Sequence, residues 1–185
     1  MLTVSGADVL VWMDLEMTGL DVEKDVIVEI AVLATTAATM EPIDEGLSVV
    51  VAQPPEVMAQ MGDFVREMHE RSGLLTEIGT VGVPLEEAGR RALEYIKGHV
   101  PMPRTAPLCG NSIGMDRRFL DRYLPDIEQH LHYRSIDVSS IKELCRRWYP
   151  EPFSARPQKV DDHRALPDIT ASIAELRYYR ETIFK

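Results

Sequence analysis

Two carboxylates, Asp14 and Glu16, stand two positions apart in the stretch 10–17, whose other residues are those of a buried strand. Successive side chains of a strand point to opposite faces, so both carboxylates emerge on the same face. Neighbouring anions repel each other, and removing each one from water is costly. The pattern therefore predicts a compensating partner, either a basic side chain or a metal ion.

Further polar groups occur where predicted strands end or helices begin. Asp116 opens a predicted helix, and His163 and Asp168 stand at the start of the last one. Together with Asp14 and Glu16 they could surround one point. Oxygen-rich sites suit Mg²⁺ and Mn²⁺ better than zinc. Two such ions about 4 Å apart can stabilise an in-line phosphoryl displacement, and a histidine with an ordinary pKa of about 6.5 could deprotonate the attacking water.

The elements that must position these groups follow from hydrophobic periodicity and turn residues. Strands are predicted over 8–16, 26–35, 46–52, 107–109 and 133–138. Helices are predicted from Pro84 to Gly98, around Met115 to Tyr123, from Ser139 through Trp148, and over about 165–182, with a loop over 150–157. Ser140 and Glu143 have the spacing of a capping box. Three leading strands followed by mixed elements predict an α/β sandwich whose sheet begins with an antiparallel meander.

Length and composition are those of a globular protein. The chain has 185 residues, 45% hydrophobic and 27% charged, which predicts one domain over 1–185. No apolar run approaches the roughly 20 residues that span a bilayer, so no membrane partner is expected. Cys109 and Cys145 are expected to be buried rather than bridged, in a reducing compartment, which favours the cytoplasm.

The charge balance limits the nucleic acids that the chain can bind. Thirty acidic and 20 basic residues give a formal net charge of −10. Proteins that hold long duplexes need a basic face for many phosphates, so that class of partner is not expected. A metal-filled acidic pocket can still attract a phosphodiester locally.

The order of these groups resembles that of the DEDDh 3′-to-5′ exonucleases: Asp-x-Glu on the first strand, a mid-chain Asp, and His-x-Ala-x-x-Asp on the last helix. Longer blocks are similar to oligoribonucleases, and together they run from about residue 9 to 182. These blocks cover residues 14–20, 110–113, 116–120, 133–144 and 172–180.

The resemblance implies a ribonuclease-H-like fold and a homodimer that degrades very short RNAs, chiefly 5′-phosphorylated dinucleotides, to mononucleotides. Asp14, Glu16 and Asp168 would hold the metal that carries the nucleophilic water. Asp14 would also bridge to a second ion, which Asp116 helps to hold through water. His163 would be the general base.

Substrate contacts are implied in the same way. Leu20 would wedge between the two bases. A cap on the 5′ phosphate would close the groove to longer chains; by resemblance it comprises Ser112, Arg134, Ser139 and His69, with Tyr133 reaching in from the partner subunit. A guanidinium suits phosphate oxygens, and hydroxyls add hydrogen bonds.

Simpler interpretations stand beside these. Asp14 and Glu16 could be salt-bridged residues at a strand edge, His163 a surface histidine, and Asp116 a residue favoured by the helix dipole. Leu20 could be an ordinary exposed leucine, His69 a surface histidine, Arg134 an ion-pair residue, Ser112 a turn residue, Tyr133 a core or interface residue, and Ser139 a helix N-cap.

The sequence departs from the family pattern at three places. Pro167 precedes Asp168, where a first helical turn tolerates it. Asp161 and Asp162 flank His163, and nearby anions raise a histidine pKa. Phe64 replaces a frequent Trp.

Three other functions remain open. A less length-selective exonuclease would share the acids and His163 but lack the phosphate cap. A non-catalytic nucleotide-binding or protein-binding module would have no use for a general base. A structural or storage metal site would have none either.

Overall fold

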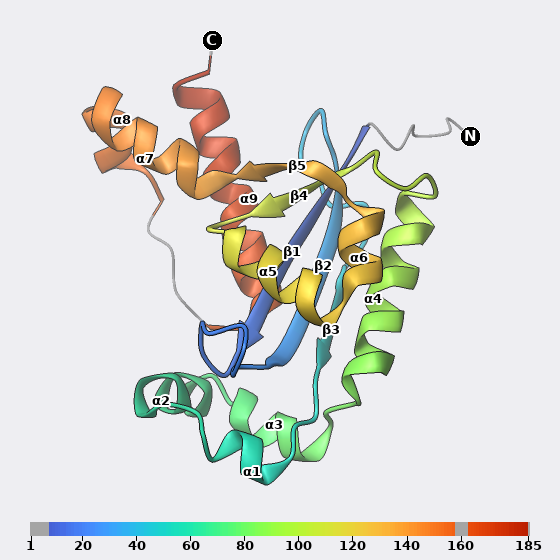
Figure 1. Ribbon diagram of the computed structural model, residues 1–185. Coiled ribbons are helices and arrows are strands. Elements are labelled where there is room, and N and C mark those ends of the chain that lie inside the picture. Colours follow the sequence, from blue (N-terminus) through green and yellow to red (C-terminus); the bar gives the residue numbers. More distant parts are fainter. Residues whose placement is uncertain (1–7, 158–162, 185) are drawn as a thin grey trace.

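The computed structural model describes residues 8–157 and 163–184. A five-stranded mixed sheet forms its centre, with helices on both faces (Figure 1). The strands are β1 Val9–Met17, β2 Ile27–Thr36, β3 Leu47–Val50, β4 Pro107–Gly110 and β5 His132–Asp137. The helices are α1 Pro55–Met58, α2 Asp63–Arg71, α3 Leu74–Thr80, α4 Leu85–His99, α5 Gly114–Tyr123, α6 Pro125–His130, α7 Val138–Trp148, α8 Pro150–Ala155 and α9 Ala165–Thr182.

The sheet has the strand order β3-β2-β1-β4-β5. β1, β2 and β3 pair antiparallel, whereas β4 pairs parallel to β1 and β5 parallel to β4. The predicted antiparallel meander at the start of the chain is therefore confirmed, and β1 lies at the centre of the sheet.

Alternation along β1 separates two apolar cores. Val11 and Met13 pack with α4, α5 and α6 on one face. Leu10 and Trp12 pack with α7 and α9 on the other. Asp14 and Glu16 continue the even-numbered register, so the carboxylates replace apolar residues on the α9 side of β1.

Several short elements were not predicted. Helices α1, α2 and α3 lie in segment 55–80 and helix α6 spans 125–130, where the sequence pattern indicates no element. The loop prediction for 150–157 was wrong, because α8 occupies most of that range. Cys109 and Cys145 are buried and unbridged, as predicted. Among the described helices, none is both long and apolar enough to cross a bilayer.

The start of α7 also differs from the prediction. Its N-cap is Asp137, whose side chain accepts a hydrogen bond from the backbone N–H of Ser139. The interpretation of Ser139 as the N-cap was therefore wrong. An aspartate fits this place, because its carboxylate can accept a hydrogen bond from an otherwise unpaired N–H of the first turn.

A buried ion pair fixes α9 against the sheet. Glu29 on β2 is 1% exposed, and its carboxylate accepts hydrogen bonds from the Arg164 guanidinium at 3.1–3.4 Å and from the Ala165 N–H at 3.2 Å. Ser48 on β3 donates to the same carboxylate at 2.8 Å. Arg164 also pairs with Glu77 of α3 at 2.7 Å. The start of α9 is thus held by a polar network with residues from β2, β3 and α3.

Arg164→Ala is expected to lower the free energy of unfolding by about 3 kcal/mol, because the buried Glu29 would lose its cation. Urea denaturation would measure the loss. Adding Glu29→Gln to this variant should recover part of it, since glutamine carries no charge.

Arg71→Ala is the matched control. Arg71 pairs with Glu67 at 3.9 Å, and both side chains are more than two-thirds exposed. Such exposed pairs contribute less than about 1 kcal/mol. Equal losses for Arg71→Ala and Arg164→Ala would contradict the importance assigned to the buried pair.

Candidate active site

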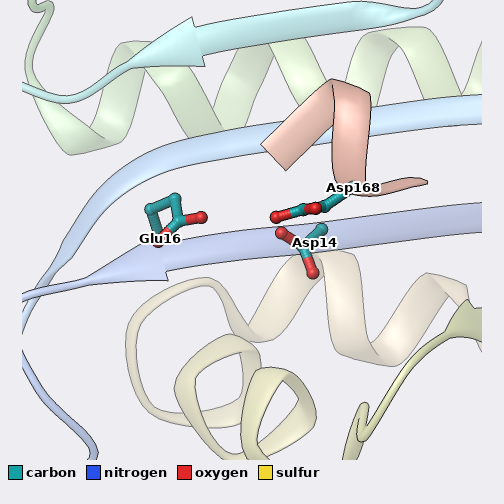
Figure 2. Close-up of side chains that lie close together, drawn as sticks. All are labelled: Asp14, Glu16 and Asp168. Carbon is teal, nitrogen blue, oxygen red and sulfur yellow. The ribbon is translucent and has the colours of Figure 1, made fainter. Parts of the chain in front are cut away.

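Three carboxylates converge at the end of β1. One oxygen each from Asp14, Glu16 and Asp168 lies within 4.8 Å of the others. Figure 2 shows these side chains pointing toward one another, two from β1 and one from the first turn of α9. Asp14 is half-buried, and the other two are 8% exposed.

This donor set fits a hard divalent cation. All three groups offer carboxylate oxygens, which Mg²⁺ and Mn²⁺ prefer. Three clustered and largely buried anions would otherwise repel one another in a medium that screens charge poorly. The acidic cluster is therefore a candidate metal centre, formed by three of the predicted ligands.

Asp116 lies beside this cluster without being part of it. Its Oδ1 accepts a hydrogen bond from the backbone N–H of Leu15, between the two β1 acids, at 3.0 Å. Asp116 is 6% exposed. Burial raises the pKa of its carboxyl to about 7, and the negative charge of Asp137 acts in the same direction. A nearby cation would lower this pKa again.

The sequence around Asp168 explains how α9 presents it. Arg164 is the N-cap of α9, and its carbonyl accepts a hydrogen bond from the Asp168 N–H at 3.0 Å. Pro167 lies within the first turn, where a missing N–H breaks no helical hydrogen bond. The helix therefore accommodates the proline directly before the carboxylate.

The two predicted histidines lie near this end of the sheet. His163 is half-buried and has a positive φ of 49°. Asp161 and Asp162, expected to flank its ring, lie outside the described residues. His69 of α2 is fully buried, and burial lowers its pKa. Its Nε2 is 2.9 Å from the carbonyl oxygen of Met17, and its Nδ1 is 4.0 Å from Glu16 Oε2.

The surroundings of His69 differ from those of a surface histidine. Both of its ring nitrogens face β1, one toward Met17 and the other toward Glu16 of the acidic cluster. The interpretation of His69 as a plain surface residue was therefore wrong. Its proposed phosphate contact stays a prediction.

Two predicted substrate residues from different elements meet in the fold. The hydroxyl oxygens of Ser112 and Ser139 are 3.0 Å apart. Asp137 holds the two segments together, because its Oδ1 accepts the backbone N–H of Ser112 at 3.0 Å and that of Ser139 at 2.9 Å. The exposed Ser112, with φ of 55°, makes the turn before α5.

Three more predicted residues present large exposed side chains. Leu20, in the loop after β1, is 66% exposed, and Tyr133 of β5 is 71% exposed. The guanidinium of the exposed Arg134 lies 5.2 Å from the centre of the Tyr133 ring. Phe64 of α2 is also exposed.

Sequence reasoning missed several residues that arrange the site. Asp137, Asn111 and Glu29 were not singled out as functional, although each orders a site segment through its side chain. Asp137 had a usable signal, since an aspartate between a strand and a helix is typical of an N-cap. The contacts of Asn111 and Glu29 join residues far apart in the sequence.

Comparison with known proteins places the chain in a family. A family model described as Exonuclease (RNase_T) matches residues 11–176. The chain is 52% identical over 177 residues to an oligoribonuclease of Mycobacterium sp. (strain KMS), covering 96% of this chain and 82% of that protein. It is 46% identical to the human mitochondrial oligoribonuclease over 181 residues, covering 98% and 76% respectively.

Solved structures of longer exonucleases share the fold. Exonuclease I from Methylocaldum szegediense has a TM-score of 0.65 at 21% identity, covering 96% of this chain. E. coli exonuclease I in complex with a dA16 oligonucleotide has a TM-score of 0.66 at 15% identity, covering 94%. This chain spans 41% of each. The fold is thus the ribonuclease-H-like exonuclease fold. Fold, acidic cluster and sequence identity agree, and the chain belongs to the oligoribonuclease family of 3′-to-5′ exoribonucleases.

Proposed function

We propose that this enzyme degrades very short RNAs, chiefly 5′-phosphorylated dinucleotides, to mononucleotides. The carrying observation is the pairing of Ser112 with Ser139 close to the helix that bears Asp168. A hydroxyl of such a pair can donate a hydrogen bond to a terminal phosphate. A substrate fixed at its 5′ phosphate has no room for further nucleotides on that side.

The acidic residues would bind two metal ions. Asp14, Glu16 and Asp168 would hold one Mg²⁺ or Mn²⁺ ion, and Asp14 with Asp116 would hold a second. Such ions, when bound, lower the pKa of water and offset the charge that develops on the phosphate. His163 would accept the proton of the attacking water. Because its side chain is only half-buried, it could later release that proton to solvent.

Arg134, Ser112, Ser139 and His69 would form the phosphate cap, and Leu20 would separate the two bases. Tyr133 would reach the active site of a partner subunit in a homodimer, which its 71% exposure permits. A cap that needs few phosphates also suits a chain with a net charge of −10, because no basic track is required.

Asp116→Asn is expected to stabilise the metal-free protein at pH 8 but hardly at pH 4. The pKa of the Asp116 carboxyl rises to about 7 in the fold, against about 3.9 in an unfolded chain. Its ionised form therefore costs stability, increasingly so from pH 4 to pH 7. Thermal unfolding in chelator at both pH values measures the difference between variant and parent.

Excess Mn²⁺ should reverse that order at pH 8, since the variant offers one anion fewer to the ions. The stability gain on adding Mn²⁺ is the readout. Equal gains in parent and variant would exclude Asp116 from cation binding.

His163→Asn should lower kcat about 10²–10⁴-fold near neutral pH, the usual worth of a general base. Asparagine tolerates the positive φ of this position, so the backbone is kept. Dinucleotide affinity in chelator should change little. His99→Ala serves as the control, because His99, the last residue of α4, pairs with Asp44 of the loop between β2 and β3. Parental turnover in His163→Asn would refute the assignment.

A length series tests the proposed function itself. Purified enzyme with Mg²⁺ would receive 5′-phosphorylated RNAs of two to seven nucleotides, with chelator as control. The dinucleotide should be cleaved far faster than the others, and Arg134→Ala should reduce that advantage. Equal rates at all lengths would instead identify a general 3′-end exonuclease.

A further inference from the structure

A chain of hydrogen bonds joins the paired serines to the helix that carries Asp168. The Oγ of Ser139 is 3.1 Å from Asn111 Oδ1, and Asn111 Nδ2 is 2.8 Å from Ser172 Oγ. Ser172 Oγ in turn is 2.8 Å from the carbonyl oxygen of Asp168. Asn111, in the turn after β4, is the link between the two sides.

The direction of this chain follows from its α9 end. A carbonyl oxygen can only accept, so the single proton of Ser172 points to Asp168 and Ser172 must accept from Asn111. The Nδ2 of Asn111 therefore faces Ser172, and its Oδ1 faces Ser139. The 3.5 Å separation between Asn111 Nδ2 and a carboxylate oxygen of Glu175 agrees with this orientation.

The other end of the chain lies at the proposed phosphate site. Since Asn111 Oδ1 can only accept, Ser139 gives its proton to Asn111. Ser139 is then the acceptor in its contact with Ser112, which donates. Of these hydroxyls, that of Ser112 can turn its proton to a ligand without breaking the connection to α9.

The α9 side of the connection is firmly held. Ser172 is 3% and Glu175 7% exposed. The Glu175 carboxylate is paired with Lys142 of α7 at 3.0 Å and accepts the Tyr179 hydroxyl at 2.8 Å. Asn111 thus bonds to a buried polar network on α9, so its amide orientation is set from the side remote from the substrate.

We propose that Asn111 is a positioning residue. It holds the Ser139 hydroxyl as the fixed neighbour of Ser112, whose own proton serves a 5′-terminal phosphate, and it ties both serines to the helix bearing Asp168. This inference rests on the proposed function, because it assumes that the phosphate binds at Ser112, beside Ser139. Without the Asn111 amide, the Ser139 hydroxyl loses its fixed acceptor and Ser112 loses a fixed partner.

The experiment compares two diadenylates that differ only at their 5′ end: 5′-phosphorylated pApA and 5′-hydroxyl ApA. Asn111→Ala and Ser172→Ala are each measured for kcat and KM with Mg²⁺, and for affinity to both ligands in chelator. Thr170→Val is the matched control. Thr170 is exposed on the same helix, and its hydroxyl also bonds a carbonyl four residues back, that of Leu166.

In Asn111→Ala, the preference for pApA over ApA in kcat/KM should fall about tenfold or more, the scale of one hydrogen bond to a charged group. The fall should appear chiefly in KM for pApA and in its affinity in chelator. Ser172→Ala should show a smaller fall in the same direction, and Thr170→Val none. In the double variant, the loss of preference for pApA, expressed as a free energy, should be smaller than the sum of the losses in the two single variants. Both changes interrupt the same chain of hydrogen bonds.

The remaining outcomes separate this inference from the function on which it rests. A parent enzyme that cleaves pApA and ApA equally well has no phosphate cap. The proposed function and the role of Asn111 would then both be refuted. A parent that prefers pApA while Asn111→Ala keeps the full preference leaves the cap intact and overturns the role of Asn111. Equal losses on both substrates in Asn111→Ala would mean a merely structural residue and would also overturn it.

Discussion

The arrangement of the site depends on the neutralisation of Glu29. Glu16 and Glu29 are direct cross-strand partners in the β1–β2 pairing, and like charges in such positions repel each other. Arg164 and the N–H of Ala165 take up the charge of Glu29. The Glu16 carboxylate instead lies close to those of Asp14 and Asp168. One ion pair therefore decides which of two adjacent glutamates belongs to the acidic cluster, and it also sets where α9 begins.

Helix α9 joins several parts of the site. Asp168 contributes to the acidic cluster, and Ser172 and Glu175 contact Asn111 one and two turns further along. These residues share one buried stripe with Ile169 and Tyr179, at spacings of three and four residues that place side chains on one helix face. Because the helix is anchored at its start, a displacement of α9 would move the Asp168 carboxylate and the contacts to Asn111 together.

The parts of this structure that were predictable from sequence are those encoded locally. Apolar runs predicted the bounds of β1 and β2 to within a residue or two, and those of α9 as observed. The alternation of side chains along a strand placed Asp14 and Glu16 on one face. The unpredicted parts depend on register between distant segments. The pairing of Glu16 with Glu29, the Arg164 contact to Glu77 and the bond from Asn111 to Ser172 all require the folded sheet and helices. The N-cap at Asp137 was local and was missed because the Ser140–Glu143 spacing offered a competing signal.

The buried carboxyl of Asp116 makes the stability of the fold depend on pH and on nearby cations. Its pKa of about 7 means that, near neutral pH, this carboxyl is partly protonated and partly ionised in the metal-free chain. A cation held beside Asp116 would favour the ionised state of this carboxyl. If such a cation bound only the native chain, it would shift the folding equilibrium by mass action. A divalent ion held beside Asp116 would then raise the fraction of folded enzyme near neutral pH.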